Sequence, residues 1–119
     1  RMYKFSPDGA LLWKYQSGLG NTPTVSSIMD GSVYLNTVLG WVVALDMETG
    51  KERWATRISE STNGDTACVF ALNGTVVTAT RRRGGYSELN SAIVALNTDG
   101  SERWKYELQW QVFNWQGSA

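Results

Sequence analysis

Apolar and polar side chains alternate along most of this chain in short runs, and turn-forming residues separate the runs. The run Val42–Leu45 is apolar and β-branched, and the turn Glu48–Gly50 follows it. From Lys51 to Trp54 the side chains alternate between the two faces of an extended segment. The pattern predicts a buried strand, a turn and a half-exposed strand, and no segment of the chain shows helical periodicity.

This strand–turn–strand unit occurs three times. In each copy a Trp follows a Gly by four residues, in the pairs Gly9 and Trp13, Gly50 and Trp54, and Gly100 and Trp104. We expect each Gly to adopt positive φ in its turn. A large ring at one fixed offset predicts packing between repeats rather than contact with a ligand, because stacked repeats cannot bury their faces alone.

A second half of the repeat is built on two hairpin signals, Asp30-Gly31 and Asn73-Gly74, each between short β-branched runs. Gly31 and Gly74 are 43 residues apart, while successive Trp residues of the motif are 41 and 50 residues apart. Four short strands in a period of about 40–45 residues are typical of a β-propeller blade. The predicted fold class is therefore all-β, made of four-stranded antiparallel blades.

The whole chain, residues 1–119, is predicted to be one partial propeller. Residues 1–16 are the outer strands of one blade, 22–58 a second blade, 65–108 a third, and 109–119 lead into a next blade. The strands expected in the two whole blades are 24–29, 32–37, 41–46, 51–58, 66–72, 75–80, 91–97 and 101–108. Closed propellers need about four to eight blades, so we expect an incomplete ring that further blades or other chains complete.

The middle copy carries a fuller pattern, Ala-x-Asp-x-x-x-Gly-x-x-x-Trp, in Ala44, Asp46, Gly50 and Trp54. This resembles the tryptophan-docking motif of the pyrroloquinoline-quinone (PQQ) repeat superfamily. That superfamily includes PQQ-dependent alcohol and glucose dehydrogenases and also non-catalytic relatives, such as the BamB-like lipoprotein of outer-membrane assembly. The resemblance implies the fold, and both groups carry the motif.

The flanking copies depart from the motif. The third keeps Ala95 but has Asn97 in place of Asp, and the first has Lys4 in place of Ala and Ser6 in place of Asp. Degenerate motifs are commoner in the non-catalytic relatives, so these departures favour a non-catalytic member.

Composition limits the kinds of binding and catalysis that we expect of this chain. Eleven basic and eleven acidic residues balance, and there is neither a His nor an apolar run long enough for a transmembrane segment. No nucleic-acid partner is expected without a basic surface. Cys68 is the single cysteine and is expected to be a buried, inert thiol. No catalytic, cofactor-binding or metal-binding residue is predicted.

Two regions outside the motif are candidate contacts for a partner or ligand. The third blade has an insertion between its second and third strands that contains Arg81, Arg82, Arg83 and Tyr86, and three arginines suit a carboxylate, a phosphate or an acidic surface. Trp110 and Trp115 follow the last expected strand. The alternatives are a solvated hairpin for the arginines and packing against a next blade for the tryptophans.

The predicted function is a non-catalytic scaffold that binds proteins or further propeller blades and needs no cofactor. One alternative is a fragment of a PQQ-dependent alcohol or sugar dehydrogenase, which would use PQQ and calcium. Another is a propeller that binds a small ligand or sugar through the arginines and the aromatic tail. The residues themselves carry no compartment signal, and the resemblance alone favours an extracytoplasmic location, periplasmic or lumenal.

Overall fold

The structure is a computed structural model that describes residues 1–20, 26–37, 39–58, 69–81 and 91–108. These residues form ten β-strands in three antiparallel sheets. The described ranges include no helix long and apolar enough to cross a membrane. The predicted all-β class is confirmed.

Each sheet is a meander in which every strand pairs with the next strand of the chain. The first sheet contains β1 (Met2–Phe5) and β2 (Leu11–Tyr15). The second contains β3 (Ser27–Met29), β4 (Ser32–Asn36), β5 (Trp41–Asp46) and β6 (Glu52–Arg57). The third contains β7 (Phe70–Leu72), β8 (Thr75–Arg81), β9 (Ser91–Asn97) and β10 (Glu102–Leu108).

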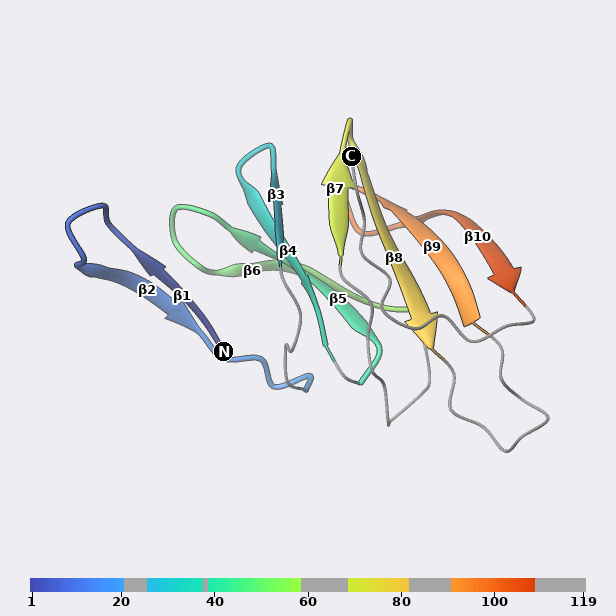
Figure 1. Ribbon diagram of the computed structural model, residues 1–119, viewed down its shortest axis with the longest axis horizontal. Coiled ribbons are helices and arrows are strands. Elements are labelled where there is room, and N and C mark those ends of the chain that lie inside the picture. Colours follow the sequence, from blue (N-terminus) through green and yellow to red (C-terminus); the bar gives the residue numbers. More distant parts are fainter. Residues whose placement is uncertain (21–25, 38, 59–68, 82–90, 109–119) are drawn as a thin grey trace.

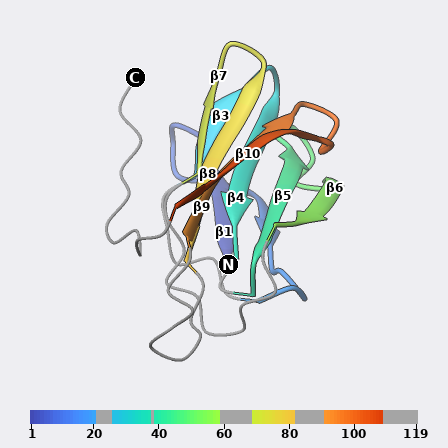
Figure 2. The ribbon, with the colours of Figure 1, turned by 90° about the vertical axis from the view of Figure 1, so that its right-hand side faces the viewer.

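The three sheets follow one another along the long axis of the molecule, with β1–β2 at one end and β7–β10 at the other (Figure 1). Viewed from that second end, the sheets lie one behind another (Figure 2). The principal extents are 50 × 26 × 23 Å. This is a stack of blades, the arrangement that an incomplete propeller ring requires.

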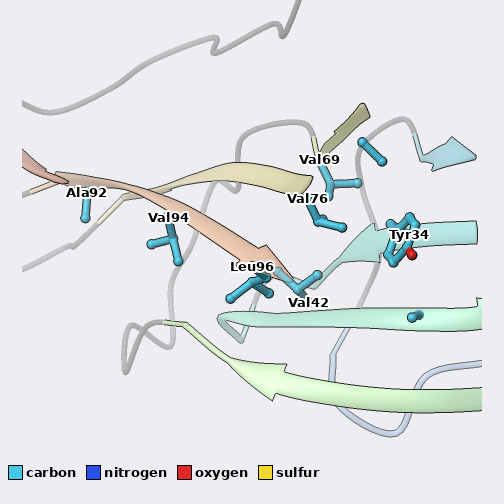
Figure 3. Close-up of a cluster of buried hydrophobic side chains, with 9 residues drawn as sticks. Tyr34, Val42, Val69, Val76, Ala92, Val94 and Leu96 are labelled. Atoms are coloured by element: carbon cyan, nitrogen blue, oxygen red, sulfur yellow. The ribbon is translucent and has the colours of Figure 1, made fainter. Parts of the chain in front are cut away.

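The core lies between the sheets, and the period of two along β4 and β5 divides it into two layers. Four buried residues face the first sheet: Val33, Leu35, Val43 and Leu45. The alternate positions Tyr34, Val42 and Ala44 face the third sheet. Figure 3 shows Val42 beside Leu96 of the third sheet, and the same cluster includes Tyr34, Val69, Val76, Ala92 and Val94. The central strands β4 and β5 of the middle sheet are therefore buried on both faces.

The two predicted hairpin turns adopt the expected backbone conformation. Asp30 and Gly31 have φ of 50° and 75°, and Asn73 and Gly74 have φ of 52° and 76°. Two successive positive φ angles define the type I′ turn, which matches the twist of the strands that it joins. Since Asn73-Gly74-Thr75 forms this turn, β7 and β8 pair in the expected register, with Leu72 opposite Thr75.

Candidate functional site: the joints between neighbouring sheets

The Trp of one sheet lies on the turn of the next sheet. The indole N–H of Trp13 donates a hydrogen bond to the carbonyl oxygen of Met47 at 2.9 Å. Its ring covers Gly50, where an added Cβ would lie 2.5 Å from the ring carbon Cδ2. Gly50 also has φ of +73°, so both its backbone and its ring contact require glycine.

Trp54 repeats this contact one sheet further along. Its indole N–H donates to the carbonyl oxygen of Thr98 at 2.8 Å, and a Cβ on Gly100 would lie 2.7 Å from its Cδ2 atom. The Thr56 hydroxyl adds a hydrogen bond of 2.7 Å to the carbonyl oxygen of Gly100. The chain therefore contains two equivalent joints, each made by a Trp on the last strand of one sheet and a Gly turn on the next.

The first residue of the motif pairs across the sheet with the motif Trp. Ala44 is the cross-strand partner of Trp54, and Ala95 is the partner of Trp104. In the first sheet Lys4 takes this place opposite Trp13. The ammonium group of Lys4 donates to the Met47 carbonyl at 2.9 Å, the same acceptor that Trp13 uses. This departure from the motif thus adds a hydrogen bond to the first joint.

Asp46 fixes the turn that contains Gly50. Its carboxylate accepts hydrogen bonds from the backbone N–H groups of Glu48 at 2.8 Å and Thr49 at 3.1 Å. Its second oxygen pairs with the Arg53 guanidinium at 2.7 Å. The pKa of Asp46 is lowered to about 2, chiefly by the hydrogen bond from Arg53 and then by those from the backbone N–H groups. Asp46 therefore caps the turn and forms an ion pair with Arg53.

Arg53 has a role that the sequence pattern did not reveal. Besides Asp46, it donates to the Ser32 hydroxyl at 2.7 Å, so it connects the last strand of its sheet to the start of β4. Arg103 makes the equivalent bond to Thr75 in the third sheet. The sequence does contain a signal for this bond. In both copies an Arg directly precedes the motif Trp, and a hydroxyl residue directly follows the hairpin Gly.

The third turn is one residue shorter than the middle turn, and different groups hold it. Asn97 stands where Asp46 stands in the middle copy, and its amide donates to the Ser101 hydroxyl at 3.0 Å. The carboxylate is supplied by Asp99, which accepts from the backbone N–H of Ser101 at 3.0 Å and from its hydroxyl at 2.6 Å. These bonds, the hydroxyl first, lower the pKa of Asp99. The altered motif still presents Gly100 to Trp54.

The second joint continues inward to the short strands. The backbone N–H of Ala71 donates to the Ser27 hydroxyl at 3.0 Å. Deeper in the joint, the Asn36 amide donates to the Thr78 hydroxyl at 3.2 Å, and both side chains are buried. A buried polar pair of this kind fixes one alignment of the two sheets, because any slip leaves a polar group without its partner.

One Gly and one Trp of the repeat take no part in either joint. Gly9 has φ of +92°, and an added Cβ there would meet no atom within 4 Å. Trp104 is 46% exposed on β10. They lie in the first and third sheets, at opposite ends of the stack (Figure 1).

The predicted partner contacts fall mostly outside the described ranges. Arg82, Arg83, Tyr86, Trp110 and Trp115 lie outside them, as does Cys68. Arg81 is the last residue of β8, and its side chain is not described either. Among the residues with described positions, no group of three or more His, Cys, Asp or Glu side chains could hold a metal ion.

Residues 1–114 match the family model described as outer membrane protein assembly factor BamB. The chain belongs to this family. Among curated proteins, it is similar to a putative dehydrogenase XoxF of Paracoccus denitrificans, with 32% identity over 113 residues. That match covers 82% of the chain and 18% of the relative, so the chain spans less than a fifth of the relative's length.

Solved structures of a dehydrogenase and of a BamB protein both resemble this BamB-family chain. A europium-containing methanol dehydrogenase matches with a TM-score of 0.69 and 19% identity, over 83% of the chain and 19% of that protein. BamB from Moraxella catarrhalis matches with a TM-score of 0.63 and 22% identity, over 82% of the chain and 27% of that protein. At these identities the likeness establishes the fold, which confirms the predicted propeller class and the resemblance to quinoprotein and BamB-like repeats.

Proposed function

We propose that this chain is a non-catalytic propeller segment that serves as a scaffold for protein partners. The proposal is supported by the match of residues 1–114 to the assembly-factor family, and the use of the motif residues is compatible with it. Trp13, Trp54 and Asp46 direct their polar atoms to backbone groups or to Arg53 within the stack. The most conspicuous aromatic and acidic groups of the repeat thus act in assembly of the blades.

In this proposal the motif residues have a docking role. They are Gly9, Trp13, Ala44, Asp46, Gly50, Trp54, Ala95, Gly100 and Trp104. The family description, an assembly factor for outer membrane proteins, supports a partner that is itself a protein. The loop that contains Arg81–Arg83 and Tyr86, and the tail that contains Trp110 and Trp115, are proposed contact regions for that partner.

The second candidate function is a segment of a PQQ-dependent dehydrogenase. The observation that favours it is the 32% identity to a putative dehydrogenase, since the BamB structure shares 22% with the chain. In that case PQQ and a metal ion would bind to a propeller of which this chain is a part.

The two functions differ in what the native protein contains. The test is to purify, from its source, the polypeptide that contains these residues, then measure PQQ by absorbance after denaturation, metal content by mass spectrometry, and alcohol oxidation with an artificial electron acceptor. The scaffold proposal predicts a protein companion in constant ratio, with no stoichiometric quinone and no dye reduction. Stoichiometric PQQ together with dye reduction would overturn it and establish the dehydrogenase.

A further inference from the structure

Hydrogen bonds join the short inner strands of the second and third sheets, β3 and β7, in a contact that we call the inner seam. The backbone N–H of Ala71 on β7 donates to the Ser27 hydroxyl at 3.0 Å. The backbone N–H of Gly74, in the turn after β7, donates to the sulfur of Met29 at 3.3 Å. A thioether sulfur is a weak acceptor, so the bond to Met29 is the weaker of these two.

The sulfur end of the inner seam lies next to solvent. Met29 directly precedes the Asp30-Gly31 turn, and both Asp30 and Asn73, at the tips of the two hairpins, are exposed. Figure 1 and Figure 2 both show these tips side by side at the upper edge of the molecule. Met29 itself is half-buried and packs against the core cluster that the second and third sheets share. Its side chain therefore lies between an apolar core and an exposed turn, where a small oxidant dissolved in water can approach it.

We propose that Met29 is a redox-sensitive switch that a peroxide oxidises and that thereby loosens the inner seam. Hydrogen peroxide transfers one oxygen atom to the thioether. The O–O bond breaks, an S–O bond forms, and the remaining oxygen keeps both protons and leaves as water. The sulfur loses two electrons, and the peroxide gains them. Methionine sulfoxide is polar, and reductases convert it back to the thioether, so the change is reversible.

The geometry of the inner seam leaves no favourable place for the added oxygen. An N–H···O hydrogen bond spans about 2.9 Å between its heavy atoms. Because the Gly74 nitrogen is 3.3 Å from the sulfur, an oxygen between them must push the turn after β7 away from β3. An oxygen on the opposite side of the sulfur would lie among the apolar side chains of the core cluster, where a polar atom is unfavourable. Oxidation therefore weakens the contact between β3 and β7 in both orientations.

The chain itself supplies a conservative variant and a matched control. Leu72 directly precedes the Asn73-Gly74 turn as Met29 precedes the Asp30-Gly31 turn, so Leu suits this position and contains no sulfur to oxidise. Met29→Leu is therefore the variant that removes the response. Met47 is the control, because it is half-buried and packs at the first joint, while no hydrogen bond among the described residues ends on its sulfur.

The test is peroxide treatment of the full-length polypeptide that contains these residues, followed by mass spectrometry of the Met29 peptide and by hydrogen exchange of the Ala71 and Gly74 amides. We expect a sulfoxide at Met29 in the folded protein and exchange at Gly74 that is about tenfold faster. Exchange in the Met29→Leu protein should not change on treatment, whereas the Met47→Leu protein should respond as the wild type does. Methionine sulfoxide reductase should restore the slow exchange of the wild type.

The outcome is independent of whether the propeller is a scaffold or an enzyme, because each protein is compared with itself before and after treatment and the readout is local. If Met29 stays reduced until the protein unfolds, the proposal is wrong. A Met29 sulfoxide that leaves exchange at Ala71 and Gly74 unchanged also overturns it. An equal rise in exchange in the Met29→Leu protein would assign the effect to another oxidised group, and this too would overturn the proposal.

Discussion

At the scale of single residues, each joint depends on a glycine that satisfies two conditions at once. Gly50 has φ of +73° and lies beneath the Trp13 ring, whereas Gly31 has φ of +75° with nothing within 4 Å of an added Cβ. The two positions therefore share the backbone requirement and differ in the ring contact. This pair separates the two contributions.

We predict that Gly50→Ala destabilises the fold by about 2–5 kcal/mol, because about 1–2 kcal/mol of backbone strain adds to about 1–3 kcal/mol for displacing the Trp13 ring. Gly31→Ala should cost about 1–2 kcal/mol, the backbone contribution alone. Urea unfolding of the two variants measures the difference. Equal losses would mean that the ring is not seated on Gly50.

The pH dependence of stability provides a second prediction at this scale. The pKa of Asp46 is lowered from 3.8 to about 2, chiefly by Arg53 and then by the backbone N–H groups of Thr49 and Glu48. A carboxyl group whose folded pKa is depressed stabilises the fold above its unfolded pKa, and this contribution is lost as the pH falls toward the folded value. The sensitive window therefore runs from about 3.8 down to about 2.

We expect the thermal midpoint of Asp46→Asn to change less across this window than that of the wild type. Arg53→Met, which removes the largest cause of the shift, should flatten the profile in the same direction. If the profiles of the wild type and both variants ran parallel, Arg53 would not be the main cause of the lowered Asp46 pKa.

At the scale of elements, the last strands of the second and third sheets carry the same motif Trp in different environments. Trp54 on β6 packs against the third sheet and bonds to Thr98, while Trp104 on β10 is 46% exposed. Identical substitutions at the two positions therefore compare a joint with an open face.

For the monomer at high dilution, we predict a loss of about 3 kcal/mol for Trp54→Ala, at the lower end for removing a packed Trp. Trp104→Ala should change the stability of the same monomer by no more than about 0.5 kcal/mol. Chemical denaturation monitored by circular dichroism measures both. A similar loss at both sites would show that Trp54 contributes local strand stability and no joint.

The sequence predicted these elements well where local pattern decides them. β5 runs from Trp41 to Asp46 as expected, because a short apolar run is followed by a strong turn. β6 begins at Glu52 rather than at the expected Lys51, since the Lys51 carbonyl accepts the N–H of Asp46 in the turn. Such shifts arise from hydrogen bonds that cross the turn and leave no trace in hydrophobic periodicity.

The contacts between sheets could be predicted only in part. The Gly–Trp spacing predicted packing between repeats, but it does not specify that Trp13 donates to Met47 or that Lys4 shares that acceptor. The bond from Asn36 to Thr78 joins residues 42 positions apart on different sheets. Partners of this kind depend on the alignment of two blades, which the hydrophobic periodicity of each strand does not encode.

At the scale of the whole molecule, the two end faces decide how the stack is completed. The first sheet exposes Tyr3 and Phe5, and the third exposes Trp104 and Tyr106. The middle sheet shows how such faces are satisfied, because neighbouring sheets cover it on both sides. We therefore expect the native particle to cover both ends as well.

The mass of the native particle that contains this chain, with every polypeptide in it identified, tests whether the chain is a segment of a closed β-propeller. A segment predicts a particle larger than the 13.2 kDa chain, in which a longer polypeptide or several copies supply enough blades to close a ring. A stable, folded monomer of 13.2 kDa with both end faces exposed would mean an open stack of sheets instead.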